Sequence, residues 1–456
     1  MTTLWSGGTS LDRAMLAYTV GDDRDWDRHL LPWDILGSLG HIEGLRASRL
    51  LSTADHTRLR AGLRAAFRAV LAGKLDIGEE HEDVHSAVEF WLTKRLGAAG
   101  QRVHTGRSRN DQVACDIRLF LKNELLGLQV SALGVAAGLL DLAERHQHAL
   151  WPGYTHTRRA MPSTAGLWAG AFAEGILDTV EALPSVWARV DRSPLGSAAG
   201  YGVPLPLRRE VAAKALGFAG LDHNVATVQN GRGKLEADVL FWCVQLGHEL
   251  SRLSSDVVLL SGEEFGLLRL PARLSTGSSI MPHKQNPDLF ELTRARVAMV
   301  EGSLATTLAL RAKLTSGYHR DFQLLKEPLI RGLARTQEML GMLAVAVPAL
   351  EVDRERGLDA LGGGALATDE VMRRVEAGTP FREAYREVSA ALKRGEAFLV
   401  PPLARLLSRR SATGAPGRLE LPRVWRRWEA ARRWSDRERD RFHRAMDRLR
   451  GKGRRG

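Results

Sequence analysis

The chain has 456 residues, 44% hydrophobic and 26% charged, and is long enough to bury a large core. We find no run of about 18 apolar residues and no secretory signal pattern at the N-terminus, so we expect neither a membrane span nor export. Only Cys115 and Cys243 are present, which argues against a disulfide framework or a cysteine-rich zinc site. A reducing compartment, the cytoplasm, is therefore expected.

The net charge of +12 lies at the C-terminal end, because residues 401–456 hold 18 Lys and Arg but only 6 Asp and Glu. This excess indicates a solvated basic helix or tail, and contact with nucleic-acid phosphates is a less favoured alternative. Trp425, Trp428 and Trp434 would lie near one face of a helix. We expect that face to pack on the body of the protein.

The first polar stretch, HTGRSRNDQ at 104–112, follows an N-terminal region with a helical pattern. Arginine forks match carboxylates and phosphates in two-point contacts, and Ser108 and Asn110 add neutral donors beside Arg109. Two interpretations are open here, a basic surface turn and a carboxylate-binding loop. Nucleic-acid binding is a third and weaker one, because no aromatic side chain is present to stack on a base.

A long helix is predicted next, over 113–150, where apolar residues recur at helical spacing without proline for roughly 57 Å. The second polar stretch, GYTHTRRAMP at 153–162, follows it and carries Thr155 and His156. A histidine pKa suits proton transfer near neutral pH. A lone histidine is nevertheless more often a structural hydrogen-bonding residue, so both interpretations stay open.

The third polar stretch, GSSIMPHKQNPD, occupies 277–288 between two strongly helical segments. Asn286 is predicted to cap a helix that begins at Pro287. The residues before it can then form a loop. That loop is either a plain surface loop or one that approaches a ligand through Ser278 and Lys284.

The rest of the chain is predicted to be helical almost throughout, so the fold class is all-α with an elongated central bundle. Further long helical patterns cover 163–191, 234–262, 288–314 and 327–347. We divide the chain into an N-terminal helical domain (1–110), a central long-helix bundle (111–350) and a C-terminal helical domain with the basic tail (351–456). No HExxH, CxxC or phosphate-loop motif is present, so we expect neither a metal nor a cofactor.

The three polar stretches, in this order, resemble the fumarase/aspartase superfamily, and the first and third resemble its argininosuccinate lyase branch most closely. DRHLLPWDILGS (27–38), YHRDFQLLK (318–326) and GGALATDEVMRRVEAGTPFREAYREV (363–388) extend the resemblance over roughly residues 4–390. It implies an all-α homotetramer with a twenty-helix core, in which each active site combines stretches from three subunits. It also implies that the 277–288 loop closes over a dianionic substrate at a subunit interface.

The resemblance implies cleavage of argininosuccinate to arginine and fumarate, in arginine biosynthesis and without a cofactor. Proton removal beside a carboxylate puts extra negative charge on it, so the site must supply cations and donors. Ser278 corresponds to the proton-abstracting base and Lys284 to the cation that stabilises the developing charge. His156 corresponds to the residue that transfers a proton to the departing nitrogen, and Glu291 to its partner. The positions that correspond to substrate contacts are Ser108, Arg109, Asn110, Thr155, Asn286, Tyr318, Gln323 and Lys326.

Several positions depart from the pattern of that branch. Asp23 stands where relatives usually have a substrate-contacting serine, Gln285 replaces a basic residue, and NVATVQNGRGKLE (224–236) lacks the usual Ser-Asp-Arg-Asp. WSGG also replaces the common WGGR near the start. A lyase acting on another N-substituted aspartate, such as adenylosuccinate, and a non-catalytic structural relative therefore stay as alternatives. The residues at 318–326 favour an amino-acid leaving group over a nucleotide.

Overall fold

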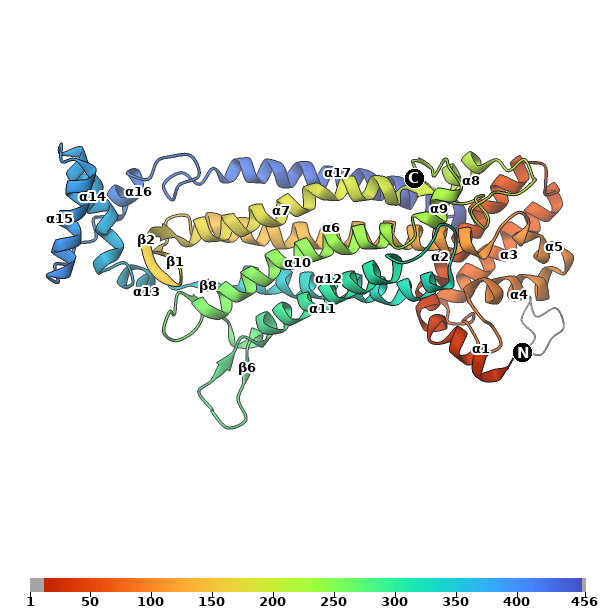
Figure 1. Ribbon diagram of the computed structural model, residues 1–456, viewed down its shortest axis with the longest axis horizontal. Helices are drawn as coiled ribbons and strands as arrows, with labels where there is room; N and C mark the ends of the chain where they lie inside the picture. The colour runs from red at the N-terminus through yellow and green to blue at the C-terminus, as the bar shows by residue number, and fades with distance from the viewer. Residues whose placement is uncertain (1–11, 453–456) are drawn as a thin grey trace.

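In the described part of the chain, residues 12–452 of a computed structural model, five long helices run side by side as a central bundle (Figure 1). They are α6 (Arg109–Arg145), α7 (Ala165–Val190), α10 (Lys234–Leu260), α11 (Asp288–Arg311) and α12 (Lys326–Ala346). These bounds match the five predicted helices closely, and the all-α prediction is confirmed. The departure WSGG lies outside the described residues.

Helix α6 packs against α7, α12 and α17 (Leu421–Arg450), and its start is fixed by Ser108. The Ser108 hydroxyl accepts a bond from the Asn110 N–H, and the Asp111 carboxylate accepts one from the Ser108 N–H. This capping box satisfies donors that the first turn of a helix leaves unpaired. By length and composition α6 could cross a membrane, but 67% of its most apolar window is buried inside the structure, as in a core helix.

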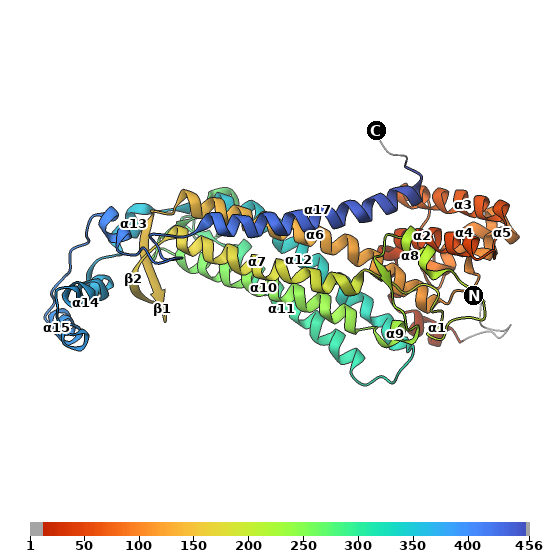
Figure 2. The ribbon, with the colours of Figure 1, turned by 90° about the horizontal axis from the view of Figure 1, so that it is seen from above.

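A second group of helices packs around the start of α6 and forms one end of the molecule (Figures 1 and 2). Asp83 caps α4 by a capping box with Ser86, which sets His85 on the buried face of that helix. Shorter helices from the middle of the chain close the same end. The group comprises α1 (Arg13–Val20), α2 (Asp23–Ala47), α3 (Thr53–Leu71), α4 (Val84–Leu96), α5 (Ala98–Gln101), η1 (Arg102–His104), α8 (Arg209–Ala215), α9 (Ala226–Asn230) and η3 (Arg320–Leu325).

Short strand pairs form the turns between the long helices. Two of them are hairpins that carry predicted site residues, β1 (Leu150–Thr155) with β2 (Arg158–Thr164), and β6 (Thr276–Gly277) with β7 (Gln285–Asn286). The others pair β3 (Arg192–Ser193) with β4 (Gly220–Leu221) and β5 (Leu268–Arg269) with β8 (Glu351–Val352). The turn η2 (Ala272–Leu274) precedes β6, and η4 (Val347–Ala349) precedes β8.

The predicted cap of α11 is wrong by one residue. Asn286 pairs with Thr276 in the β6–β7 hairpin, which holds it in an extended conformation. The helix begins at Asp288, and Pro287 occupies the cap position without a side-chain bond. The Thr276 hydroxyl instead donates to the Asp288 carboxylate across the base of the hairpin.

The C-terminal part forms the other end of the molecule and then returns along the bundle (Figure 1). It comprises α13 (Arg354–Asp359), η5 (Gly363–Leu366), α14 (Ala367–Glu376), α15 (Phe381–Lys393), α16 (Leu403–Ser408) and α17 (Leu421–Arg450). Helix α17 lies against α6 and α7. Trp425 Nε1 donates to Glu144 and Trp428 Nε1 to the Leu133 carbonyl, while Trp434 packs edge-on against Trp187.

The basic tail is thus largely an ordered helix whose tryptophan face packs on the protein, as predicted. The division of the chain into domains at residues 110 and 350 stays a prediction.

Candidate active site

A cavity of about 210 Å³ lies at the end of the bundle where α6 begins, between α2, α4, η3 and α12. Five of the predicted substrate-binding residues line it: Arg109, Asn110, Tyr318, Gln323 and Lys326. They come from two segments about 200 residues apart, so only the fold brings them together. Both signs of charge line the cavity, because Asp23, Asp27, Glu82 and Asp83 lie there with Arg109, Arg232, Arg320 and Lys326.

Lys326 is the most firmly held cation of this cavity. Its Nζ lies 2.5 Å from a carboxylate oxygen of Asp27 and 2.7 Å from one of Asp23, and all three side chains are largely buried. Burial alone would lower the pKa of Lys326, but the charges of Asp27 and Asp23 outweigh it and raise this pKa. The ammonium group therefore stays charged and fixed in position.

Asp23, which departs from the family pattern, is the titratable group of this ion-pair set. Burial raises the pKa of Asp23 to about 6; Lys326 opposes the rise and Asp27 adds to it. The carboxylate is consequently charged at pH 7.5 and mostly protonated at pH 5. The departure at residue 23 thus gives the cavity a negative charge that depends on pH.

Two residues that were predicted to contact the substrate, Gln323 and Ser108, form hydrogen bonds within the protein. The Gln323 amide nitrogen donates to the Thr19 and Val20 carbonyls at 3.0 and 3.3 Å, which ties η3 to the end of α1. The Ser108 hydroxyl accepts the capping bond of α6 and does not line the cavity. Tyr318 is 38% exposed at the cavity and packs edge-on against Phe322.

Arg232 is a cavity residue that the sequence interpretation missed. Its Nε lies 3.1 Å from a Glu236 carboxylate oxygen, and both side chains are buried. Its Nη1 is also buried and has no hydrogen-bond partner among residues 12–452. A buried guanidinium with an unused donor beside a polar cavity suits a substrate carboxylate. The signal lay in the segment 224–236, whose departure from the family pattern had been noted only as a difference.

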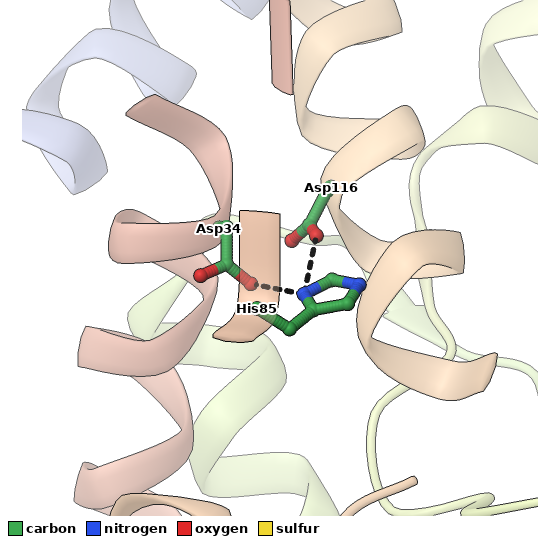
Figure 3. Close-up of side chains that lie close together, drawn as sticks. All are labelled: Asp34, His85 and Asp116. Carbon is green, nitrogen blue, oxygen red and sulfur yellow. Dashed lines mark hydrogen bonds and ion pairs between the residues drawn. The ribbon is translucent and has the colours of Figure 1, made fainter. Parts of the chain in front are cut away.

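A buried cluster behind the cavity fixes His85, one of the residues of its wall. Asp34 from α2, His85 from α4 and Asp116 from α6 meet there (Figure 3). His85 Nδ1 lies 2.8 Å from Asp34 Oδ1 and 3.8 Å from Asp116 Oδ2, and Gln112 donates to the same Asp34 oxygen at 2.6 Å. Neither Asp116 oxygen has a hydrogen-bond partner within the described chain.

Burial and the neighbouring charges together shift the pKa values of the three residues in this cluster. Burial lowers the pKa of His85 and raises that of Asp34, but their mutual attraction reverses both shifts. Burial raises the pKa of Asp116 well above its usual value, and the neighbouring charge of Asp34 adds to this rise. The three ligand atoms lie within 4.8 Å of one another, as a metal site would require, but the Nδ1 that would bind an ion is engaged by Asp34. We assign the cluster as a buried ion pair of Asp34 and His85 beside the Asp116 carboxyl group, whose pKa is raised.

Thr155 and His156 lie far from this cavity, at the tip of the β1–β2 hairpin. Thr155 pairs with Arg158, so His156 and Thr157 form a two-residue turn, and both have positive φ angles, 52° and 57°. Such a turn matches the twist of a hairpin; histidine is among the residues that tolerate a positive φ, whereas it is costly for the β-branched Thr157. His156 is thereby held exposed at the end of a rigid projection.

The third group, Ser278, Lys284, Asn286 and Glu291, lies on and just after the β6–β7 hairpin. This hairpin projects sideways from the bundle (Figure 1). The Ser278 oxygen accepts bonds from the Ile280 N–H at 3.4 Å and the Met281 N–H at 3.1 Å. Lys284 and Glu291 are exposed.

Within one chain, the residues of the cavity, of the β1–β2 tip and of the β6–β7 hairpin do not meet. Asn110 begins α6, and Thr155 follows its end; a helix of 37 residues is about 55 Å long. Ser278 precedes α11 and Tyr318 follows it, and this helix of 24 residues is about 36 Å long. Most of the predicted binding residues therefore lie at one end of the bundle. Thr155 and Asn286 instead lie with the predicted catalytic residues, on or just after the two hairpins that project toward the other end.

Comparison of this structure with solved structures shows which proteins share its fold. A crystal structure of EDDS lyase in complex with formate has a TM-score of 0.80 and 23% sequence identity, covering 97% of this chain and 96% of that one. A class II fumarase from Schistosoma mansoni has a TM-score of 0.72 and 16% identity, covering 93% and 96%. The all-α fold of this chain is thus shared with these two solved structures.

Sequence comparison narrows the proteins that share this fold to one family. A family model described as lyase matches residues 49–302. The argininosuccinate lyase of Sorangium cellulosum is 43% identical over 427 residues, 93% of this chain and 98% of that protein. The argininosuccinate lyase of Thermotoga neapolitana is 40% identical over 386 residues, 85% and 97% of the two chains. The chain belongs to the argininosuccinate lyase family.

Proposed function

We propose that this protein catalyses the β-elimination of argininosuccinate to L-arginine and fumarate, as a cytoplasmic enzyme of arginine biosynthesis. The observation that carries the proposal is the cavity at the start of α6, which joins Arg109 and Asn110 to Tyr318, Gln323 and Lys326 in a chain of this family. Argininosuccinate carries carboxylates together with a guanidinium and an amino group. A cavity lined by both signs of charge suits such a molecule better than a purely anionic one.

The geometry of the β6–β7 hairpin supports Ser278 as the base. A serine hydroxyl is a weak base in water and acts as one only when its deprotonated form is stabilised. Two backbone N–H groups already point at its oxygen, and hydrogen bonds to the charged form lower the pKa of a group. Lys284, on the same loop, would stabilise the charge that develops on the substrate carboxylate. His156 and Glu291 would then handle the proton for the departing nitrogen.

A complete site requires other copies of the chain, and we propose the homotetramer of the family, with each site shared by three subunits. The outward face of α11 supports this assembly, because apart from Glu291 and Glu301 its exposed residues are apolar or small, among them Leu292, Ala295, Ala298, Met299, Gly302, Ala305 and Leu308. Leu292 is 56% exposed and Met299 49%. A long helix with this face exposed is typical of a surface covered by another subunit.

The substrate assignment is tested by incubating the purified protein with argininosuccinate or adenylosuccinate in the presence of a metal chelator. We expect fumarate, seen by its ultraviolet absorbance, from argininosuccinate only. Fumarate from adenylosuccinate alone would favour the related lyase, and fumarate from neither would favour a non-catalytic relative. Either result would contradict the proposal.

The pKa of Asp23 predicts how substrate binding depends on pH. Between pH 7 and pH 5 the charged fraction of a group with a pKa of about 6 falls from about nine-tenths to about one-tenth. Because the charged Asp23 carboxylate would attract a cationic group of the substrate, we expect KM to rise about tenfold over this range. Because the folded pKa lies above the unfolded one, protonation in this range stabilises the fold, and unfolding would not account for the rise. The Asp23→Asn variant should show a high KM at pH 7 that stays constant down to pH 5. A variant with the pH profile of the wild type would exclude Asp23 as the titrating group.

A further inference from the structure

A second cavity, of about 620 Å³, lies outside the proposed active site, where the C-terminal end of α17 meets α2, α3 and α8. Four cationic side chains line it: Arg60 and Arg64 from α3, Lys214 from α8, and Arg448 from α17. Glu43 is the one acidic side chain among the described residues that line it. The two cavities share no lining residue, so this one is separate from the site at the start of α6.

The positive charge of this cavity is not neutralised within the described residues. Glu43, whose carboxylate oxygen lies 3.0 Å from His56 Nε2, supplies one negative charge against the four cations. Across residues 12–452, no ion pair involves Arg60, Lys214 or Arg448. Like charges that crowd into a concavity repel one another more than the same charges spread over a convex surface. An anion in the cavity would relieve this repulsion.

Arg64 has a structural role that also holds the cavity in shape. Its Nε donates to the Leu449 carbonyl at 2.7 Å and its Nη2 to the Arg448 carbonyl at 3.0 Å. These carbonyls belong to the last turn of α17, where the i+4 donors of the helix run out; the Arg448 carbonyl also accepts from the Gly451 N–H at 3.2 Å. Burial is the main cause that lowers the pKa of Arg64; the charge of Arg60 adds to it, Glu43 opposes it, and Arg68 adds a smaller contribution. The remaining three cations are available to a ligand.

The shape and composition of the cavity indicate which anion would fit. Leu39, Ala215 and Leu449 give it an apolar part, and cations enter from three separate helices. Arginine forks and a lysine point charge together match phosphate oxygens. Arg426 and Arg437 are exposed on α17 outside this cavity, where they would suit a long polyanion instead.

We propose that this cavity binds a small phosphorylated molecule with two or more linked phosphate groups, at a site separate from the catalytic one. The cations of Arg60, Lys214 and Arg448 bind the phosphate groups. A nucleoside, where one is attached, lies against the apolar part of the cavity. The proposal does not depend on the reaction that the enzyme catalyses.

The test is isothermal titration calorimetry of the full-length protein with inorganic pyrophosphate and, separately, with ADP, at a constant ionic strength of about 0.15 M. The cavity variant is Arg60→Gln/Lys214→Gln, and the matched control is Lys94→Gln/Arg426→Gln, which also removes one lysine and one arginine from exposed positions. We expect the wild type and the control to bind with equal affinity and the cavity variant at least tenfold more weakly. All three proteins should keep the same kcat and melting temperature.

The two ligands separate the sources of affinity. Equal affinity for pyrophosphate and ADP would show that the phosphate groups alone are recognised, and tighter binding of ADP would show that the apolar part contributes; both support the site. No binding by the wild type, or equal binding by all three proteins, would overturn the proposal. A short DNA duplex that binds more tightly than either ligand and depends on Arg426 rather than Arg60 would also overturn it, because recognition would then lie on α17.

Discussion

Replacing Ser278 by alanine should lower kcat by about 10³-fold, within the range that a positioned acid–base group contributes. The substitution removes the only atom on this side chain that could take the substrate proton. It should leave KM nearly unchanged, because the side chains proposed to bind the substrate, among them Asn110, Tyr318 and Lys326, are not altered. Turnover measured from fumarate release, together with the melting temperature, tests this expectation.

Ser279 provides the matched control for that experiment. It lies on the same exposed loop, but within residues 12–452 no hydrogen bond to its side chain is formed, whereas the Ser278 oxygen accepts two backbone N–H bonds. Ser279→Ala should therefore retain turnover, with an unchanged melting temperature. Similar activity in both variants, at the level of the wild type, would remove Ser278 from the role of base.

The long helices could be predicted from the sequence because their apolar spacing is local and strong. Their ends were less certain, for physical reasons that differ between helices. The apolar residues at 149–151 continue the helical period of α6, yet they belong to the hairpin that follows it, since Leu150 pairs with Thr164. At α11, the Thr276–Asn286 pairing overrides the capping preference of asparagine.

Only the site residues that lie within recognisable motifs could be predicted from the sequence. The segments 108–110 and 318–326 were identified separately, and the structure places most of their predicted residues around one cavity. The partners of Lys326 were not predictable, because Asp23 and Asp27 lie about 300 residues away in the sequence. Arg232 was missed because a buried donor without a partner is a property of the folded chain alone. Motif position also suggested a substrate contact for Ser108, whose hydroxyl is used by the cap of α6.

A second prediction with a large expected effect concerns how subunits share a site. It follows from the lengths of α6 and α11, which hold the residues of one chain apart. If Ser278 and His156 of one site come from different chains, a mixed tetramer can hold sites in which both residues are intact. In a random one-to-one mixture of Ser278→Ala and His156→Gln chains, each of the two residues that a site needs is donated in its intact form with a probability of about one half. About one quarter of the sites should then be active, although each variant alone is nearly inactive.

The control mixture combines Ser278→Ala with Lys284→Met. Both residues lie on the β6–β7 hairpin of one chain, so no site in a mixed particle can hold both of them intact. This mixture should stay inactive under the same conditions.

The most direct measurement is therefore fumarate release after the two inactive variants, Ser278→Ala and His156→Gln, are dissociated together and reassembled. Recovery of about a quarter of the wild-type rate, without recovery in the control mixture, is the predicted result. A reassembled particle of the expected size that releases no more fumarate than either variant alone would mean that one chain supplies both residues, and would contradict the shared site.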